Sequence, residues 1–375
     1  MGKLSLACVA VLLCFGPADF AQQGGEEVVP ATQAPPPGPV LSIRPAPKPV
    51  KKPDTSIKLD VVVTDGSGKP VTGLEPWDFK VTDNDQPRKI LSFHSYDGLN
   101  VRPDLPVEVI LVMDTANLQF QQVAFVRKEV GAFLRKNGGH LAQPVSLILL
   151  TDLELRMQPR PSTDGNAVAS VLDQIKGRVS HITPAMGGEG ALERFQLSAR
   201  QMGNIAENEA RKPGRKLLIW IGPGWPLVTR TELGYYSARE QRRYFDGIVQ
   251  LSTKLREARM VVYSVAPANI GAGGGNSLNT LRYKDFLKGV KSASEADSGN
   301  LSLKVLVTQT GGQILGPDND VSGQIDRCIA DADLFYRISF DPHLAGHADE
   351  YHELNVAVDK PGLTVRTNTG YYGQP

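Results

Sequence analysis

The chain has 375 residues, of which 41% are hydrophobic and 22% charged, enough for one large domain or two smaller ones. Its 41 Lys and Arg residues nearly balance its 40 Asp and Glu residues, which leaves a formal net charge of +1. This balance argues against binding to nucleic acid or anionic lipid through overall positive charge.

The first 21 residues have the pattern of an export signal. Lys3 supplies a positive charge, Leu4 to Phe15 form a short apolar run, and the small residues Ala18 and Ala21 follow near an expected cleavage point. A run of this length is shorter than the roughly 20 residues that a membrane-spanning helix needs. An uncleaved anchor is the alternative. We therefore expect a secreted or periplasmic protein with no transmembrane segment beyond the signal.

Cysteine usage is compatible with a bacterial cell envelope. Cys8 and Cys14 fall inside the expected signal, so the mature chain would keep only Cys328 and could form no internal disulfide. Cys328 shares a helical stripe with Val321 and Ile325, which predicts a buried small hydrophobic residue.

Residues 22–55 are rich in proline and are expected to form an extended linker. Residues 56–100 then change to strand patterning. Ile57 to Val63 alternate in polarity, a second strand is expected around Phe79, and a third at Ile90 to Tyr96. Such a small antiparallel unit needs a partner surface to bury a core.

Residues 105–333 alternate between buried strands and amphipathic helices. Four apolar runs predict strands that are covered on both faces: Val107 to Met113, Val145 to Leu150, Leu217 to Ile221 and Met260 to Val265. Helical spacing separates these runs. The pattern predicts an α/β fold with a doubly wound, mostly parallel sheet of the Rossmann-like kind.

Residues 334–373 return to strand character, with alternation at Tyr336 to Phe340, Leu354 to Val358 and Leu363 to Thr367. These strands are expected to pair with those of residues 56–100 in a small β-sandwich-like unit, which would make the α/β domain an insertion. Two separate β units that flank the middle domain are the alternative.

The two ends of this region carry motifs that resemble a family of acidobacterial proteins related to von Willebrand factor A (vWA) domains. The resemblance covers about residues 57–373. The motifs are Val63-Thr64-Asp65, Gly68-Lys69-Pro70-Val71, Gly73-Leu74, Asp78-Phe79, His352, Pro361-Gly362-Leu363, Val365-Arg366 and Gly370-Tyr371-Tyr372.

The resemblance implies a metal-dependent adhesion site at the carboxyl ends of the parallel strands, where Mg²⁺ or Mn²⁺ binds oxygen ligands. Asp114 stands where the family's metal loop begins, but its serine positions are Ala116 and Leu118. Glu189 or Gly190 lies where a second loop would supply a threonine. Gly222 to Pro226 contain no aspartate. We therefore expect a degenerate site without metal or other cofactor.

The same crevice is still a candidate binding site. Asp114 and Asn117 would face it, with Glu189 nearby, and Trp225 lies in a loop between two prolines. A rigidly presented tryptophan is a frequent interface anchor. The alternative is that Trp225 only covers the end of the sheet.

The densest titratable cluster contains His347, Glu350 and His352, which almost match a zinc-protease pattern. The spacing is one residue too long, and Pro342 and Gly346 favour a loop over the helix that such a motif needs. Two functions follow. The main hypothesis is an exported module that binds a protein or a cell-surface polymer and catalyses no reaction. The alternative is an envelope metal-dependent hydrolase that uses this cluster.

Overall fold

The computed structural model describes residues 55–98, 101, 103, 105–158, 160–174, 187–227, 236–268 and 282–375. The expected signal and almost all of the proline-rich linker lie outside the described residues. Residues 54–375 form one compact unit, and the elements below all belong to it. None of the described helices has the length and apolar character that crossing a membrane requires.

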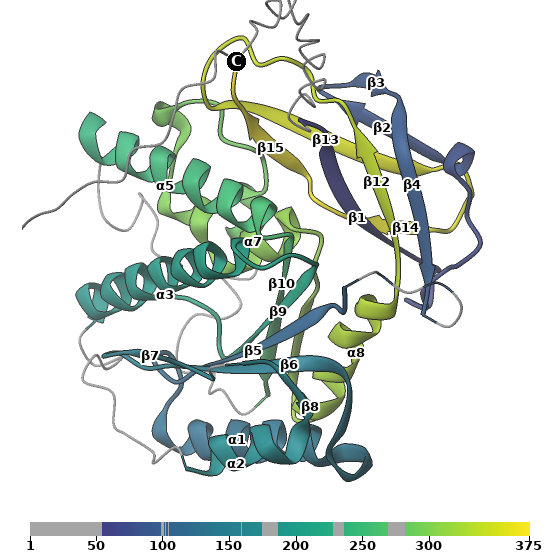
Figure 1. Cartoon of the computed structure of the whole chain (residues 1–375). Helices are drawn as coiled ribbons and strands as arrows, with labels where there is room; N and C mark the ends of the chain where they lie inside the picture. The colour runs from purple at the N-terminus through teal and green to yellow at the C-terminus, as the bar shows by residue number, and fades with distance from the viewer. Residues whose placement is uncertain are drawn as a thin grey trace, which may run out of the picture. The chain divides into compact units, whose positions relative to one another are not determined.

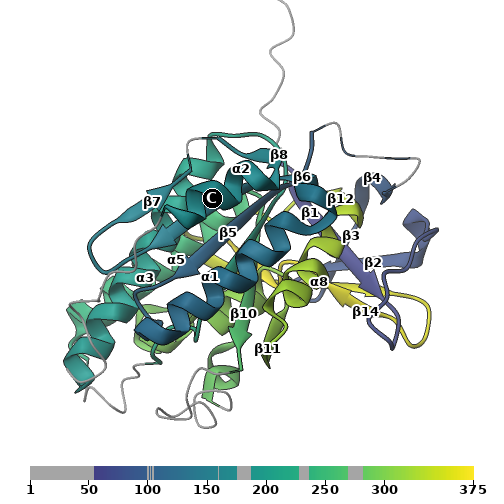
Figure 2. The ribbon, with the colours of Figure 1, turned by 90° about the horizontal axis from the view of Figure 1, so that it is seen from below.

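A central sheet has the strand order β11-β10-β9-β5-β6-β7, with β8 also paired to β6 (Figure 1; β11 is labelled in Figure 2). Strands β5, β6, β9, β10 and β11 are parallel, and the short β7 and β8 run antiparallel to β6. The mixed α/β class and the mostly parallel sheet predicted from the sequence are therefore confirmed. The strands are β5 (Glu108–Asp114), β6 (His140–Leu150), β7 (Leu155–Met157), β8 (Ser162–Asp164), β9 (Lys216–Ile221), β10 (Met260–Pro267) and β11 (Ile314–Asp318).

Helices cover both faces of this sheet because alternate strand residues point to opposite sides. Leu111 and Ile219 pack in the core beneath α1, α2 and α8, whereas Ile110 and Leu218 pack beneath α3, α5 and α7. Figure 2 shows α1 and α8 side by side on the first face. The helices are α1 (Phe120–Arg135), α2 (Gly165–Asp173), α3 (Gly187–Ala210), α5 (Ala238–Glu257), α7 (Leu303–Gln309) and α8 (Val321–Asp333).

Two four-stranded sheets lie beside this domain. Their orders are β14-β1-β12-β4 and β15-β13-β2-β3, and they share one apolar core. Strands from both ends of the described chain are neighbours in each, since β1 pairs with β12 and β14, and β2 pairs with β13. The strands are β1 (Ile57–Thr64), β2 (Phe79–Asp83), β3 (Gln86–Arg88), β4 (Ile90–Asp97), β12 (Leu334–Phe340), β13 (Glu350–Val358), β14 (Thr364–Arg366) and β15 (Gly370–Gly373).

Short 3-10 helices complete the described elements. They are η1 (Pro76–Asp78), η2 (Lys136–Gly139), η4 (Tyr283–Phe286), η5 (Ala293–Glu295) and η6 (Ser298–Leu301). The last of them, η6, packs against α5 and α7. It therefore belongs to the layer that covers the α3 side of the central sheet.

A buried ion cluster joins the paired sheets to the central domain. Asp60 of β1 accepts hydrogen bonds from Arg259, at 2.7 and 2.8 Å, and from Arg337, at 3.2 Å. Arg215, which precedes β9, lies 3.8 Å from the same carboxylate. In a second pair, Arg366 donates two 2.9 Å hydrogen bonds to Asp331. These contacts fix β1 against the beginnings of β9 and β10, and β14 against α8.

Candidate functional site

Asp114 ends β5 and is fully buried. Its Oδ2 accepts a 2.7 Å hydrogen bond from Trp220 Nε1 of the neighbouring strand β9. Asn117 donates from its side-chain Nδ2 to both oxygens, at 2.9 and 3.1 Å, and from its backbone N–H to Oδ1, at 3.1 Å. Both carboxylate oxygens are thus occupied by donors of the protein itself.

Burial dominates the acidity of Asp114. It raises the pKa of this carboxyl from 3.8 to about 6, although the hydrogen bonds from Trp220 and Asn117 favour the charged form. No described Lys, Arg or His forms an ion pair with Asp114 to offset the loss of solvation. The result is a buried acid that has no ion-pair partner among the described residues, at the carboxyl edge of a parallel sheet.

The residues around Asp114 do not suit a divalent ion. Mg²⁺ and Mn²⁺ need several oxygen ligands, whereas Asp114 is surrounded by N–H donors. Ala116 and Leu118 are buried and apolar. A Cβ added at Gly222, which follows β9, would lie 3.0 Å from the Asp114 Cβ, so a side chain there would crowd Asp114. The described residues contain no group of three or more His, Cys, Asp or Glu side chains able to hold a metal.

Two residues of α3 complete the surroundings of Asp114, and the sequence analysis did not include them. Ser198 Oγ accepts a 3.0 Å hydrogen bond from Asn117 Nδ2. Arg194 is only 8% exposed. Burial lowers its pKa, and the negative charge of Asp114 partly opposes that effect. The signal in the sequence is that Arg194 and Ser198 are one helical turn apart, with Ser198 on the buried stripe of Phe195 and Met202.

Several buried polar atoms near Asp114 have no hydrogen-bond partner among the described residues. They are Asn117 Oδ1, Arg194 Nη1 and Trp225 Nε1. An unsatisfied buried donor or acceptor costs about 1–3 kcal/mol. These atoms, two donors and one acceptor, are therefore the polar groups at this edge that remain free to meet water or a ligand.

The structure changes the roles expected for Glu189 and Trp225. Glu189 lies in the first turn of α3 instead of in a loop, and it is exposed. Trp225 does not project as a surface anchor: it is 7% exposed, and its ring packs edge-on against Trp220 at 5.1 Å. Trp225 thus covers the end of the sheet, because stacking on Trp220 buries its apolar area.

Two large apolar side chains are exposed at the same edge. Phe120, at the start of α1, is 61% exposed, and Leu153, after β6, is 56% exposed. Their loops are adjacent, since Asp114 pairs with Leu150 and the backbone N–H of Ala116 donates to the Leu150 carbonyl. We call Phe120 and Leu153 the apolar rim.

His347, Glu350 and His352 do not form a common site. His347 is exposed, and its Nδ1 lies 2.9 Å from the carbonyl of Ala348. Glu350 accepts a hydrogen bond from the backbone of Gly346. His352 is buried on β13, a strand and not a helix. Glu350 and His352 are two residues apart on β13 and share a face, but His347 lies in the preceding segment, and the described residues contain no group of three such side chains able to hold a metal.

His352 instead belongs to a buried polar cluster inside the paired sheets. Its Nδ1 lies 2.9 Å from Asp83 Oδ1, and Tyr371 donates to Asp83 Oδ2 at 2.7 Å. Burial would raise the pKa of Asp83, but the hydrogen bonds from His343, Tyr371 and His352 lower it below its usual value. This cluster connects β2, β13 and β15, which identifies it as a structural network.

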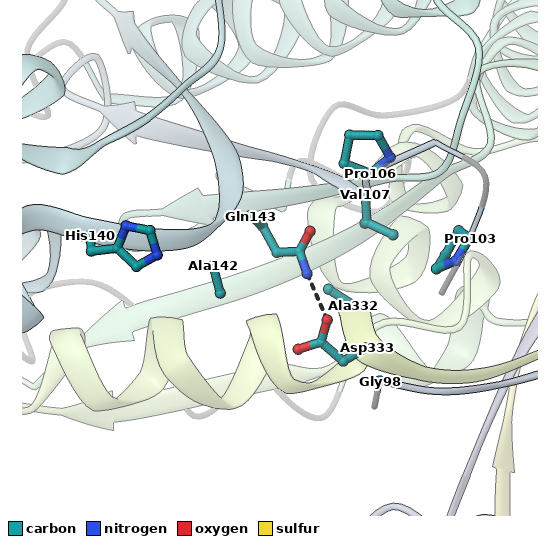
Figure 3. A pocket seen from close by; sticks show the side chains of 9 residues that line it. All are labelled: Gly98, Pro103, Pro106, Val107, His140, Ala142, Gln143, Ala332 and Asp333. Carbon is teal, nitrogen blue, oxygen red and sulfur yellow. Dashed lines mark hydrogen bonds between the residues drawn. The ribbon is translucent and has the colours of Figure 1, made fainter. Parts of the chain in front are cut away.

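A cavity of about 430 Å³ lies at the opposite, amino-terminal ends of β5 and β6 (Figure 3). Val107, His140, Gln143 and Asp333 are among its lining residues. Gln143 Nε2 donates a 2.6 Å hydrogen bond to Asp333 Oδ1 across it. Because these two polar groups satisfy each other, this cavity is a weaker candidate than the Asp114 edge.

Comparisons with family models and with curated proteins find no match. Solved structures of several proteins are similar at low identity, among them the following three. The human COPII-coat protein Sec24c is 10% identical, with a TM-score of 0.31, over 72% of this chain and 44% of that chain. A point mutant of the PilB minor pilin from Streptococcus sanguinis is 9% identical, with a TM-score of 0.36, over 62% of this chain and 64% of that chain.

The third structure is the pilus adhesin SpaC from Lactobacillus rhamnosus GG, which is 10% identical, with a TM-score of 0.33, over 81% of this chain and 49% of that chain. This chain therefore spans less than two thirds of each of the three proteins. Similarity at these TM-scores supports no conclusion about a shared function.

Proposed function

We propose that this chain is an exported, vWA-like interaction module whose protein partner docks at the carboxyl edge of the central sheet without a metal ion. The observation that carries the proposal is the state of Asp114, whose two oxygens already accept protein donors. An acid held in this way cannot offer ligands to a bridging cation. Recognition then falls to the side chains around it.

The apolar rim supports a protein partner over a cell-surface polymer. Phe120 and Leu153 expose more than half of their surface at this edge, and exposed apolar side chains are typical anchors of protein interfaces. The motifs that resemble vWA-related proteins and the signal-like N-terminus support export to the cell surface or periplasm. The partner's polar groups would meet Arg194 and Asn117 next to the rim.

A capture experiment tests this proposal. The chain, lacking its first 21 residues, is immobilised and exposed to cell-envelope extract with and without EDTA. We expect the same partner protein to be retained in both conditions. The Phe120→Ser/Leu153→Ser double variant should retain at least tenfold less of the partner protein than the unsubstituted chain, because the interface loses its apolar anchors.

The matched control is Leu91→Ser/Leu344→Ser. These leucines are 51% and 84% exposed but lie on β4 and in the segment before β13, away from the rim. The control pair should retain the partner. Equal capture by both double variants, or capture abolished by EDTA and restored by Mg²⁺, would contradict the proposal.

A further inference from the structure

We propose that a cavity between α3 and α5 binds an aromatic ring that carries a carboxylate group. The cavity has a volume of about 480 Å³, within the usual range for small-ligand sites. It lies near the N-terminal ends of both helices and is separate from the residues that hold Asp114. The inference goes beyond the proposed function because it assigns a ligand class to a second site.

The floor of the cavity is apolar. Phe195 of α3 is 2% exposed and Leu301 of η6 is 8% exposed, so both are fixed in the core with one side facing the cavity. Leu192 adds apolar surface from the preceding turn of α3. A ligand ring placed here would bury apolar surface without displacing any of these side chains.

Two tyrosines form an aromatic wall on the α5 side. The rings of Tyr236 and Tyr244 lie 4.8 Å apart at an angle of 34°, and both line the cavity. The Tyr236 hydroxyl is held by Ser298 Oγ at 3.0 Å. Burial raises the pKa of Tyr244 above its usual value, so this side chain stays neutral. Tilted aromatic neighbours of this kind favour another ring as ligand.

The rim of the cavity carries a net positive charge, because two arginines and one glutamate line it, and Arg243 is close enough to Glu240 to help lower the pKa of that carboxyl. Arg200 and Arg243 are exposed lining residues, and neither forms an ion pair with a described carboxylate. Arg242 differs, because it pairs with Asp246 at 2.8 Å. The one acid in the lining, Glu240, accepts hydrogen bonds from the backbone and hydroxyl of Ser237 at the start of α5.

The apolar floor, the aromatic wall and the two arginines together define the ligand chemistry. Arginine guanidinium groups bind carboxylates through charge-assisted, often bidentate hydrogen bonds. A ring on the apolar floor would leave its carboxylate near Arg200 and Arg243 at the opening. A free aromatic acid has this chemistry, and so does the carboxyl-terminal phenylalanine of a polypeptide.

Titration calorimetry with four probes tests the inference and distinguishes these sources. The probes are phenylacetate, its neutral analogue phenylacetamide, N-acetyl-Gly-Gly-Phe with a free carboxylate, and the same peptide as an amide. We expect each acid to bind at least tenfold more tightly than its amide. Tighter binding of the peptide acid than of phenylacetate would identify a polypeptide terminus as the source, and the reverse would identify a free acid.

Substitutions locate the binding. Arg200→Gln/Arg243→Gln should weaken binding of the acids at least tenfold, whereas Arg239→Gln, an exposed arginine of α5 outside the lining, should change it less than twofold. Ala199→Phe, which fills the cavity from α3, should abolish binding of the acids and of the amides. Absence of saturable binding by any acid, or unchanged affinity in the double variant, would overturn the inference. Partner capture through the apolar rim is a separate measurement, which these variants should leave intact.

Discussion

Asp60 and Asp114 are both withdrawn from solvent, yet their surroundings shift their pKa values in opposite directions. Burial would raise the pKa of Asp60, but Arg259, Arg215 and Arg337 lower it below its usual value. Asp114 has only neutral donors in contact, and burial raises its pKa to about 6. Asp60 forms ion pairs with arginines, whereas Asp114 forms none with the described residues.

This difference separates a structural acid from a candidate functional one. The charge of Asp60 holds three arginines at the junction between β1 and the beginnings of β9 and β10. Asp114 holds only the loop that follows it, through Asn117, and the indole of Trp220. A buried acid with a raised pKa at the carboxyl edge of a parallel sheet is a common feature of functional sites.

Removing Asp60 should have the largest effect on stability. We expect Asp60→Ala to lower the free energy of unfolding by about 3–5 kcal/mol, because three buried or half-buried guanidinium groups lose their counter-charge. Urea unfolding followed by circular dichroism measures the loss. The control is Asp359→Ala, which removes a solvent-exposed pair with Lys80 and should leave stability near wild type. A loss as small as the control's would show that Asp60 does not hold the junction.

The second prediction concerns the pH dependence of stability through Asp114. Because its folded pKa is raised from 3.8 to about 6, its contribution is fully present below pH 3.8 and is lost as pH rises to about 6. A shift of roughly two units corresponds to about 3 kcal/mol. The difference in the free energy of unfolding between wild type and Asp114→Asn should therefore fall by about this amount as pH rises from 3.8 to about 6.

Unfolding free energies of both proteins at several pH values from 3.5 to 7 check this prediction. Asp60→Asn is the comparison variant, since the lowered pKa of Asp60 means that its contribution is lost only as pH falls below about 3.8; its difference from wild type should therefore stay nearly constant while that of Asp114→Asn changes. Parallel profiles for wild type and Asp114→Asn would mean that Asp114 is not the strained acid of this fold.

The central sheet could be predicted from the sequence, because a strand that is buried on both faces has a continuous run of apolar residues. Val107 to Met113 falls within β5 and the residue before it, and Leu217 to Ile221 lies within β9. The sequence also placed Asp114 at the strand end. For the flanking strands the sequence favoured pairing between the two ends without excluding separate units, since alternation at Ile57 to Val63 is also compatible with an isolated β unit.

The contacts of Asp114 could not be predicted from the sequence, because the local residue pattern does not contain the information that determines them. Trp220 reads as one more apolar residue of a buried strand, and its indole reaches Asp114 only because β9 is the neighbour of β5. Ser198 reaches Asn117 because α3 packs over that edge. Strand order and helix placement are tertiary properties. Residue types at a loop therefore indicated a degenerate metal site but not what replaces it.

The smallest of these effects should come from the indole that holds Asp114. Trp220→Phe removes the hydrogen bond to Oδ2 and should cost about 2 kcal/mol, because a bond to a charged group is lost. Trp225→Phe is the matched control: its ring packs on Trp220, and its Nε1 has no partner among the described residues.

Since the Trp220 bond favours the charged carboxylate, its loss should raise the pKa of Asp114 further, whereas Trp225→Phe should leave that pKa unchanged. Carboxyl ¹³C shifts recorded against pH measure this directly. Equal pKa values in the two variants would show that burial alone, and not its donors, determines the acidity of Asp114.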